Sequence, residues 1–347
     1  MNTKLDENYD LDMGSSLEAI GSLLEFVRMV KHIVSTQPND VIAKEFVSIK
    51  KKFPNVKLLL CETGENADFS TLVSNEETMK RFAKESASYL RKWNMNGLDL
   101  DWEFPTWSWD ATKSDKYRFT SLLKILREAY GSDLLLTAAV SGPPTITRKA
   151  YEIHEFNRYL DLVHVMNYDF HVFNFLTNPV VGFNAPLRRM RGEEGPIGEM
   201  NSEASMATYR QLGLWENKTL FGIPTYNLAF KLINYWLHKP FSPAEGSVDG
   251  FGDRSTICKI LEDRHTYKYV WNERAASPYI WGKDKVWISM EDERSVSRKA
   301  AYAMQLGVAG VMIFHIGSDD VHGSCGNGEY PLLNAISKEI HTKSNKI

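Results

Sequence analysis

Three acidic residues occupy alternate positions in one short stretch of the 347-residue chain, NGLDLDWEFP at residues 96–105. Side chains of a β-strand alternate between its two faces, so Asp99, Asp101 and Glu103 are predicted to share one face, with neighbours about 6–7 Å apart. The apolar residues between them are predicted to face a layer of helices. Crowded carboxylates raise one another's pKa values, and an acid that stays protonated near neutral pH can act as a general acid.

Two other interpretations of this stretch remain open. It could be a solvated acidic strand edge, although the intervening residues are too apolar for an edge. Alternating aspartates can also hold Mg²⁺ or Ca²⁺. Neither a glycine-rich phosphate loop nor a histidine cluster accompanies these acids. The sequence therefore favours proton-transfer chemistry, with no metal and no cofactor.

The composition argues against several classes of function. The 41 basic and 44 acidic residues nearly balance, which gives no electrostatic basis for binding nucleic acid or an anionic membrane. Since no run of about 18 apolar residues is present, no membrane-spanning helix is predicted. A hydrophobic content of 43% is typical of a globular protein with a large core.

Short apolar runs alternate with longer amphipathic ones, which predicts a parallel α/β architecture. The apolar runs are rich in Leu, Ile and Val on both faces, as expected for parallel strands covered by helices. Strands are predicted at 56–62, 97–103, 134–142, 162–169, 220–226 and 310–317. Helices are predicted at 42–52, 76–94, 115–130 and 296–306.

Two segments depart from this alternation. Residues 231–289 are too long for a strand-to-helix connection and predict an inserted subdomain. Residues 22–29 could form a short strand or a helix, so a seventh strand is possible and no eighth is predicted. Residues 1–19 are predicted to be disordered, and they lack the basic and apolar regions of a secretory signal. Either the protein is cytosolic, or the sequence lacks its true start.

The stretch NGLDLDWEFP resembles DGxDxDWEYP, the signature of glycoside hydrolase family 18, which comprises chitinases and chitinase-like lectins. Four further segments resemble the family's third, sixth, seventh and eighth strands, in that order: FPNVKLLLCETGENADFSTLVSN, LDLVHVMNYDFH, LFGIPTYNLAF and GVMIFHIGSDD. The resemblance covers roughly residues 20–340. It implies a (β/α)8 TIM barrel with a small α+β insertion, residues 231–289, between strands seven and eight. The family's first strand is missing or degenerate.

The resemblance also implies a mechanism, substrate-assisted retaining hydrolysis of β-1,4-linked N-acetylglucosamine polymers. Glu103 is expected to protonate the glycosidic oxygen while the substrate's own acetamido carbonyl attacks the anomeric carbon. Asp101 is expected to bind the acetamido N–H, and Asp99 to tune the charge of Asp101. Tyr168 is expected to donate to the acetamido oxygen, and Asp169 to bind a sugar hydroxyl.

Three more residues are expected to line the sugar cleft by the same resemblance. Tyr226 in GIPTY matches a cleft residue of the family. Phe314 stands on the eighth strand, where the family usually has a tryptophan as the floor of the cleavage site. Met166 is expected to pack inside the barrel near the sugar, and an ordinary core position is an equally open alternative.

Several aromatic residues that stack on sugar rings in the family are replaced. Glu65 and Asn174 stand at positions where the family has tryptophan, and Val172 replaces a glycine. Phe173 and Phe175 are candidate substitutes for the lost aromatic surfaces. The alternative function is therefore a chitinase-like lectin that binds the polymer with little or no turnover.

A disulfide is implied by the resemblance as well. Cys258 and Cys325 match family positions that pair in secreted members, whereas Cys61 is expected to be a buried free thiol. Such a disulfide requires an oxidising compartment, so the resemblance suggests an extracellular protein. We expect a monomer that binds chitin or N-acetylglucosamine oligosaccharides.

Overall fold

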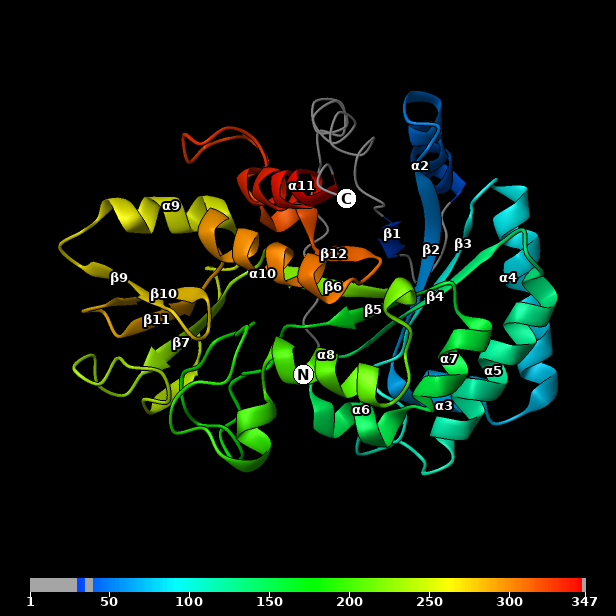
Figure 1. Cartoon of the computed structure of the whole chain (residues 1–347), viewed down its shortest axis with the longest axis horizontal. Helices are drawn as coiled ribbons and strands as arrows, with labels where there is room; N and C mark the ends of the chain where they lie inside the picture. The colour runs from blue at the N-terminus through cyan, green and yellow to red at the C-terminus, as the bar shows by residue number, and fades with distance from the viewer. Residues whose placement is uncertain (1–29, 35–39, 345–347) are drawn as a thin grey trace.

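A curved parallel sheet forms the centre of the protein, whose computed structural model describes residues 30–34 and 40–344 (Figure 1). Its strands follow the order β1-β2-β3-β4-β5-β6-β12, and every neighbouring pair is parallel. They are β1 (Val30–Val34), β2 (Lys57–Thr63), β3 (Gly97–Asp101), β4 (Leu135–Ser141), β5 (Leu162–Met166), β6 (Thr219–Pro224) and β12 (Gly310–Phe314). The six predicted strands are all present, and the parallel sheet agrees with a (β/α)8 barrel.

In the described part of the chain this sheet has seven strands, with β1 and β12 at its two ends. The strand or helix predicted at 22–29 and the disorder predicted for 1–19 lie outside the described residues. The sequence analysis missed β1, which begins directly after the 22–29 segment and pairs with β2 from Val30↔Lys57 to Val34↔Cys61.

Helices cover the outer face of the sheet (Figure 1). The four predicted helices correspond to α2 (Asp40–Lys52), α4 (Glu76–Lys92), α5 (Asp115–Tyr130) and α10 (Glu293–Leu306). The other helices around the barrel are α3 (Asn66–Leu72), α6 (Pro144–Ala150), α7 (Ile153–Tyr159), α8 (Ser202–Gln211), α11 (Pro331–Ser344) and the short turns η1 (Gly195–Glu199), η2 (Glu216–Lys218) and η3 (Ile316–Ser318).

Local sequence signals explain where α10 begins and ends. The Asp292 side chain accepts from the backbone N–H of Ser295, and the Ser295 hydroxyl accepts from the N–H of Asp292, which completes a capping box. Gly307 ends the helix with φ of 72°, in the left-handed region where glycine carries no steric penalty. Both signals determine the ends of the helix that precedes β12.

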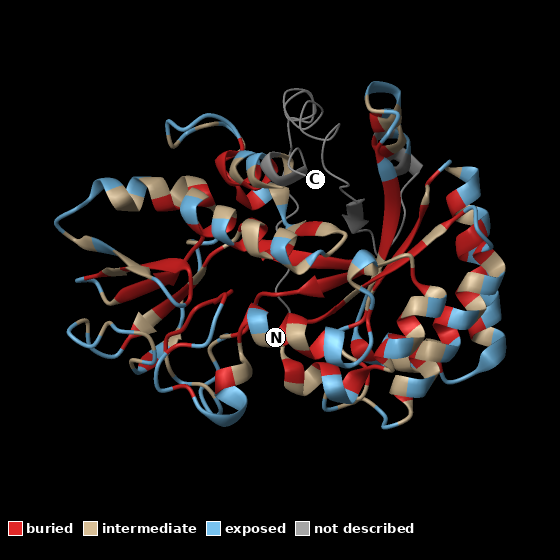
Figure 2. Cartoon of the chain, viewed as in Figure 1, coloured by how far each residue is buried: buried red, intermediate tan, exposed pale blue. Residues whose placement is uncertain are grey.

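The apolar face of β3 packs under these helices. Leu98 and Leu100 are fully buried, and Trp102 follows them on the same side. Figure 2 shows the strands of the central sheet largely in the colour of buried residues. The Trp102 ring stacks on Phe69 at 5.3 Å between centroids and meets Phe119 edge-on at 5.7 Å. Because strand side chains alternate, this packing turns the acidic positions of β3 toward the barrel interior.

The chain between β6 and α10 forms a second, antiparallel sheet, which lies at the left of Figure 1. Its strand order is β8-β7-β11-β10-β9, with β7 (Leu228–Leu232), β8 (Ala244–Ser247), β9 (Tyr267–Asn272), β10 (Ser277–Gly282) and β11 (Val286–Ser289), accompanied by α9 (Arg254–Glu262). Phe183, Phe230 and Trp287 form much of its own buried core. This unit occupies the predicted insertion, except that its first strand begins at Leu228.

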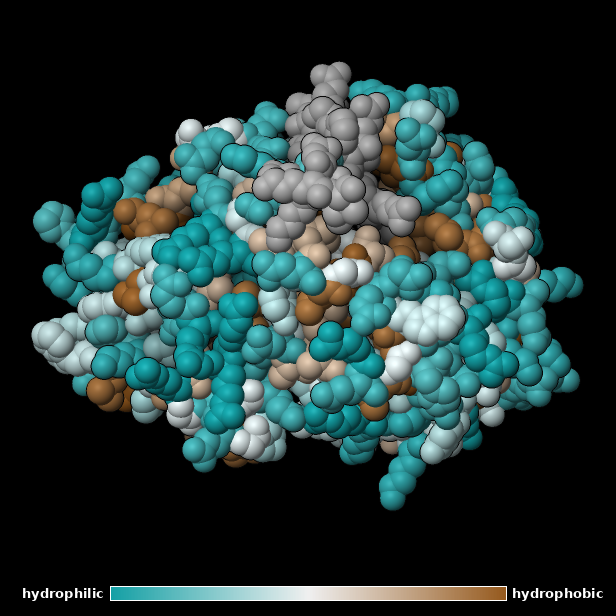
Figure 3. All heavy atoms as spheres, in the orientation of Figure 1, coloured by the Kyte–Doolittle hydropathy of each residue, from teal (hydrophilic) through white to brown (hydrophobic). Residues whose placement is uncertain are grey.

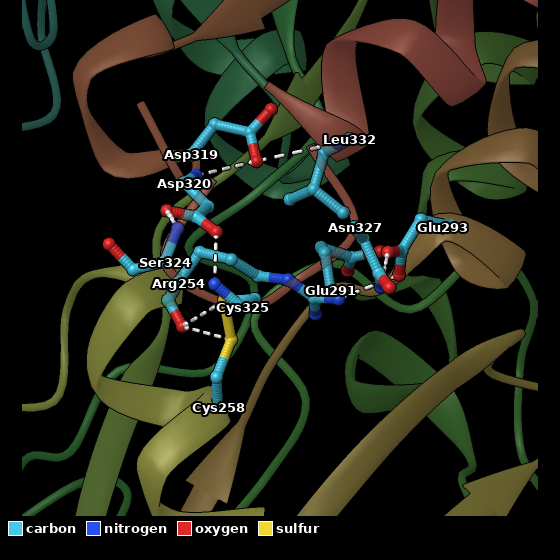
Figure 4. The surroundings of a disulfide bond; sticks show 10 residues. All are labelled: Arg254, Cys258, Glu291, Glu293, Asp319, Asp320, Ser324, Cys325, Asn327 and Leu332. Atoms are coloured by element: carbon cyan, nitrogen blue, oxygen red, sulfur yellow. Dashed lines mark hydrogen bonds and ion pairs between the residues drawn. A yellow bond between two sulfur atoms is a disulfide. The ribbon is translucent and has the colours of Figure 1, made fainter. Parts of the chain in front are cut away.

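The disulfide between Cys258 and Cys325 joins this unit to the loop that follows β12 (Figure 4). The Cα atoms are 5.5 Å apart, across 67 positions of sequence. Arg254, on the same helix as Cys258, donates to the Glu293 carboxylate at 2.6 Å. On the other side, the Asp320 carboxylate accepts from the backbone N–H of Cys325 at 2.7 Å. The expected disulfide is present, and Cys61 is buried and unbridged.

None of the helices in residues 40–344 combines the length and apolar character needed to cross a membrane. The face seen in Figure 3 is mainly hydrophilic, with hydrophobic side chains scattered over it.

Replacing both Cys258 and Cys325 by serine is predicted to lower the free energy of unfolding by about 2–4 kcal/mol, because the unfolded chain regains the freedom of a long loop. Urea unfolding monitored by tryptophan fluorescence measures this change. The parent with a reductant should lose the same stability, and the double variant should not respond to reductant. Equal stability of parent and double variant under oxidising conditions would contradict the prediction.

Candidate active site

The three acids of β3 lie at increasing distance from the protein interior. Asp99 is 1% exposed, Asp101 at the end of the strand is half-buried, and Glu103 is exposed just beyond it. They therefore run from the barrel interior to the carboxyl ends of the strands, where parallel α/β barrels place their active sites. The peptide bond after Glu103 is cis.

Asp99 is held by side chains from three other strands. The Thr137 hydroxyl of β4 donates to its Oδ1, and the Cys61 thiol of β2 lies 3.7 Å from its Oδ2. Nδ1 of the buried His164 on β5 lies 3.9 Å from Oδ1. A buried carboxylate is costly without such partners. Thr137 and His164 were not predicted from the sequence, and the signal that could have indicated them is a polar residue at an inward position of a neighbouring strand.

Asp101 has a strongly raised pKa and an unpaired oxygen. Burial, together with the negative charges of Glu103 and Asp99, raises the pKa of Asp101 to about 7. Its Oδ1 is buried and has no hydrogen-bond partner among the described residues. An oxygen in this condition is well suited to hold a proton or to accept one N–H from a bound molecule.

Glu103 also has a raised pKa, although its side chain is exposed at the end of the strand. Desolvation by the surrounding protein is the main cause, and the negative charge of Asp169 adds to it. The same desolvation raises the pKa of Asp169, and the hydrogen bond from Tyr226 opposes that rise. A raised pKa favours the protonated carboxyl that general acid catalysis requires.

An aromatic cluster lies at the ends of β5, β6 and β12. Tyr168 stacks on Phe314 at 5.7 Å between centroids with an interplanar angle of 19°, and meets Tyr226 edge-on at 5.9 Å. Phe314 is 45% exposed. Met166 is buried in the same cluster, beside Tyr168 and Met312. The aromatic side chains predicted for the cleft are thus in mutual contact.

Polar contacts fix the orientation of this cluster. The Tyr226 hydroxyl donates to Oδ1 of Asp169 at 2.6 Å. Asp169 has φ of 55°, a left-handed conformation that aspartate adopts more readily than most residues, and its N–H donates to Oδ1 of Asn184 at 2.8 Å. The Tyr168 hydroxyl donates to the sulfur of Met312 at 3.8 Å, and burial raises the pKa of Tyr168 well above its ordinary value. Tyr168 is therefore a phenol donor whose present acceptor is weak.

The two candidate substitutes for the lost aromatic surfaces differ from each other. Phe173 is partly buried against the core of the antiparallel sheet, whereas Phe175 is 77% exposed. Glu65, at a position where the resemblance expects tryptophan, is exposed. In residues 30–34 and 40–344 no group of three His, Cys, Asp or Glu side chains is arranged to hold a metal ion.

Asp101→Asn is predicted to stabilise the protein at pH 7–8 but not at pH 3. A carboxyl with a raised pKa binds its proton more tightly when folded, so stability falls as the pH rises from the unfolded value of 3.8 to about 7. Above that window the full cost is present, up to about 4 kcal/mol from the pKa difference.

Urea unfolding of parent and Asp101→Asn between pH 3 and 8 measures this effect. The stability difference should widen with pH, whereas Asp249→Asn, at an exposed position, should give a constant difference. A constant difference for Asp101→Asn as well would show that Asp101 is not a high-pKa group.

A model of the family "Glycosyl hydrolases family 18" matches residues 23–319. Mouse (Mus musculus) chitotriosidase-1 is 32% identical, over 93% of this chain and 72% of that protein. The chain spans 60% and 56% of the lengths of two insect relatives, a probable chitinase of Drosophila melanogaster and an endochitinase of Manduca sexta, at 30% and 29% identity.

Two solved structures are similar throughout most of the chain. A group IV chitinase of Ostrinia furnacalis superposes with a TM-score of 0.80 at 30% identity, covering 86% of this chain and 84% of that one, and has also been solved in complex with allosamidin. Human YKL-39, described as a pseudo-chitinase with retained chitooligosaccharide binding, gives a TM-score of 0.79 at 26% identity, covering 87% of this chain and 85% of that one.

Proposed function

Because the chain belongs to glycosyl hydrolase family 18, we propose that it hydrolyses β-1,4-linked N-acetylglucosamine polymers with retention of configuration. One observation carries the proposal: Asp101, at the end of β3, and Glu103, just beyond it, lie at the carboxyl end of the strand, and burial raises the pKa of both. A raised pKa favours the protonated form that a general acid needs for cleavage of a glycosidic bond.

In the first step Glu103 donates its proton to the glycosidic oxygen. The carbonyl oxygen of the substrate's acetamido group attacks the anomeric carbon, the glycosidic bond breaks, and an oxazolinium ion forms. Burial raises the pKa of Glu103, which favours the protonated carboxyl that this step requires. No second carboxylate has to act as the nucleophile, since the substrate supplies it.

Asp101 orients and stabilises that acetamido group. Its unpaired Oδ1 accepts the acetamido N–H, and its negative charge stabilises the oxazolinium cation. Asp99, which accepts from Thr137 and lies beside His164, is placed behind Asp101 and tunes its charge. In the second step Glu103 takes a proton from water, which opens the oxazolinium ring from the face that the leaving sugar occupied.

The aromatic cluster binds the sugar. Tyr168 exchanges its weak bond to the Met312 sulfur for a bond to the acetamido oxygen, which is a stronger acceptor. Asp169, already hydrogen-bonded to Tyr226, accepts from a sugar hydroxyl. The exposed face of Phe314 packs on the apolar face of the pyranose ring.

A lectin that binds the same polymer without efficient cleavage is the second candidate. It is supported by Glu65 and Asn174, which provide no aromatic surface, and by Phe314, whose ring is smaller than an indole. The similarity to a pseudo-chitinase agrees with this alternative. The presence of Glu103 favours the hydrolase.

An extracellular or otherwise oxidising location is part of the proposal. The Cys258–Cys325 disulfide would be reduced in a glutathione-rich cytosol, and it joins the antiparallel sheet unit to the barrel. The monomeric state that we expect needs no second chain to complete the site, because every proposed residue comes from this one.

Glu103→Gln is predicted to lower the release of N-acetylglucosamine dimers from a soluble hexamer by about 10²–10⁴-fold, because the amide cannot donate a proton to the leaving group. Affinity for the hexamer, measured by calorimetry, should remain within a few-fold of the parent. Glu128→Gln, on an exposed position of α5, should leave both quantities unchanged.

Dimer release by Glu103→Gln at the parental rate would overturn the mechanism. Hexamer binding by the parent with no dimer release would select the lectin instead.

A further inference from the structure

The loop between β3 and α5 carries two exposed tryptophans that the proposed mechanism does not use. Trp107 is 44% exposed, and Trp109 is 98% exposed. Within the described residues no hydrogen bond or ring contact engages the Trp109 indole. A single exposed apolar side chain is ordinary on a protein surface, and what distinguishes these two is the location of their loop.

One end of the loop is held beside the proposed proton donor. The backbone N–H of Trp107 donates to the carbonyl oxygen of Phe104 at 3.2 Å. The Ser108 hydroxyl donates to the carbonyl oxygen of Glu103 at 3.3 Å. These contacts fold the chain back over the end of β3. Both tryptophans therefore belong to a turn that is hydrogen-bonded to the backbone at the end of this strand.

The other end of the loop is held beside a position that lacks its expected aromatic residue. The Asp110 carboxylate accepts from Nδ2 of Asn66 at 2.9 Å, and Oδ1 of the same amide accepts from the Trp102 indole at 2.6 Å. Asn66 directly follows Glu65, where the resemblance expects tryptophan. Trp109, next to Asp110, therefore lies beside the segment from which an aromatic surface is missing.

The two indoles differ in how they are restrained. The Lys149 ammonium lies 5.2 Å from the centroid of the Trp107 ring, and the Thr106 hydroxyl donates to the carbonyl oxygen of Lys149 at 3.1 Å. Trp107 is thus fixed against the end of α6. Trp109 has both faces open to solvent and is the better placed of the two to stack on a ligand.

We infer that Trp109, with Trp107 beside it, is a stacking platform for a pyranose ring of the polymer next to the ring cleaved at Glu103. The inference rests on the proposed function, because it takes the same N-acetylglucosamine chain as the ligand. An indole face and the C–H face of a pyranose ring both lose unfavourable hydration when they stack. The platform replaces, from a different strand, the aromatic surface that Glu65 cannot provide.

Hexamer binding by Trp109→Ala, measured calorimetrically in the Glu103→Gln background so that no turnover occurs, tests the platform. Affinity should fall by about tenfold, the scale of one aromatic stacking contact, and Trp109→Phe should recover most of it. In the parent background, Trp109→Ala should raise KM more than it lowers kcat, because the platform binds ground state and transition state alike.

Trp215→Ala is the matched control. Trp215 is 56% exposed and, like Trp107, has a lysine over its ring. It precedes β6, so it lies near the amino ends of the parallel strands, whereas Trp109 follows the carboxyl end of β3. Its replacement should leave hexamer affinity unchanged.

Equal hexamer affinities for Trp109→Ala and Trp215→Ala would overturn the platform. Loss of affinity in Trp109→Ala, combined with a parent that binds but does not cleave, would support the platform and overturn the hydrolase. A parent that does not bind the hexamer would overturn both.

Discussion

Burial of carboxylates at the carboxyl end of one strand, together with the repulsion between them, is the constraint around which the rest of the site is arranged. Asp99 is too deeply buried to be solvated by water, so hydrogen-bond donors from the strands on both sides compensate its charge. Asp101 has no such donors, and its pKa rises instead. The three carboxyl groups therefore differ in burial and in hydrogen-bond partners, and this difference suits them to distinct roles.

The opposite face of β3 enforces this arrangement. Leu98, Leu100 and the stacked Trp102 fill the layer between sheet and helices, so a slip of one residue would bury the acids there and expose the apolar side chains. Trp102 also links the core to the site. Its indole N–H donates to Asn66, and the Asn66 amide donates to Asp110 in the loop that carries Trp109. The core packing that fixes the acids therefore also places the loop beside them.

Much of this fold could be predicted from local patterns, because the predicted strands are short runs rich in Leu, Ile and Val and the helices are amphipathic. The strand β1 was missed, since Lys31 and His32 interrupt its apolar run while 22–29 look more strand-like. Thr137 and His164 were missed for a different reason: their approach to Asp99 depends on register between strands, which one sequence does not specify. Phe173 could not be assigned, because the inserted sheet determines its burial.

The residues proposed to transfer protons and those proposed to stack on sugar rings differ in how closely they match the family pattern. By the resemblance, the acids and Tyr168 match the family pattern, whereas Glu65 and Asn174 stand where the family has tryptophan and Phe314 presents a smaller ring than an indole. Loss of stacking weakens binding of long chains without removing the means to move a proton, provided that other aromatic side chains hold the polymer. Retention of configuration is the decisive property of the proposed mechanism, because retention follows when the substrate's own acetamido group acts as the nucleophile.

The most direct test is the anomeric form of the first disaccharide released from an N-acetylglucosamine hexamer, followed by proton NMR before mutarotation. Substrate-assisted catalysis at Glu103 and Asp101 predicts that the β-anomer appears first and the α-anomer grows in later. Initial release of the α-anomer, or no release of disaccharide at all, would contradict it.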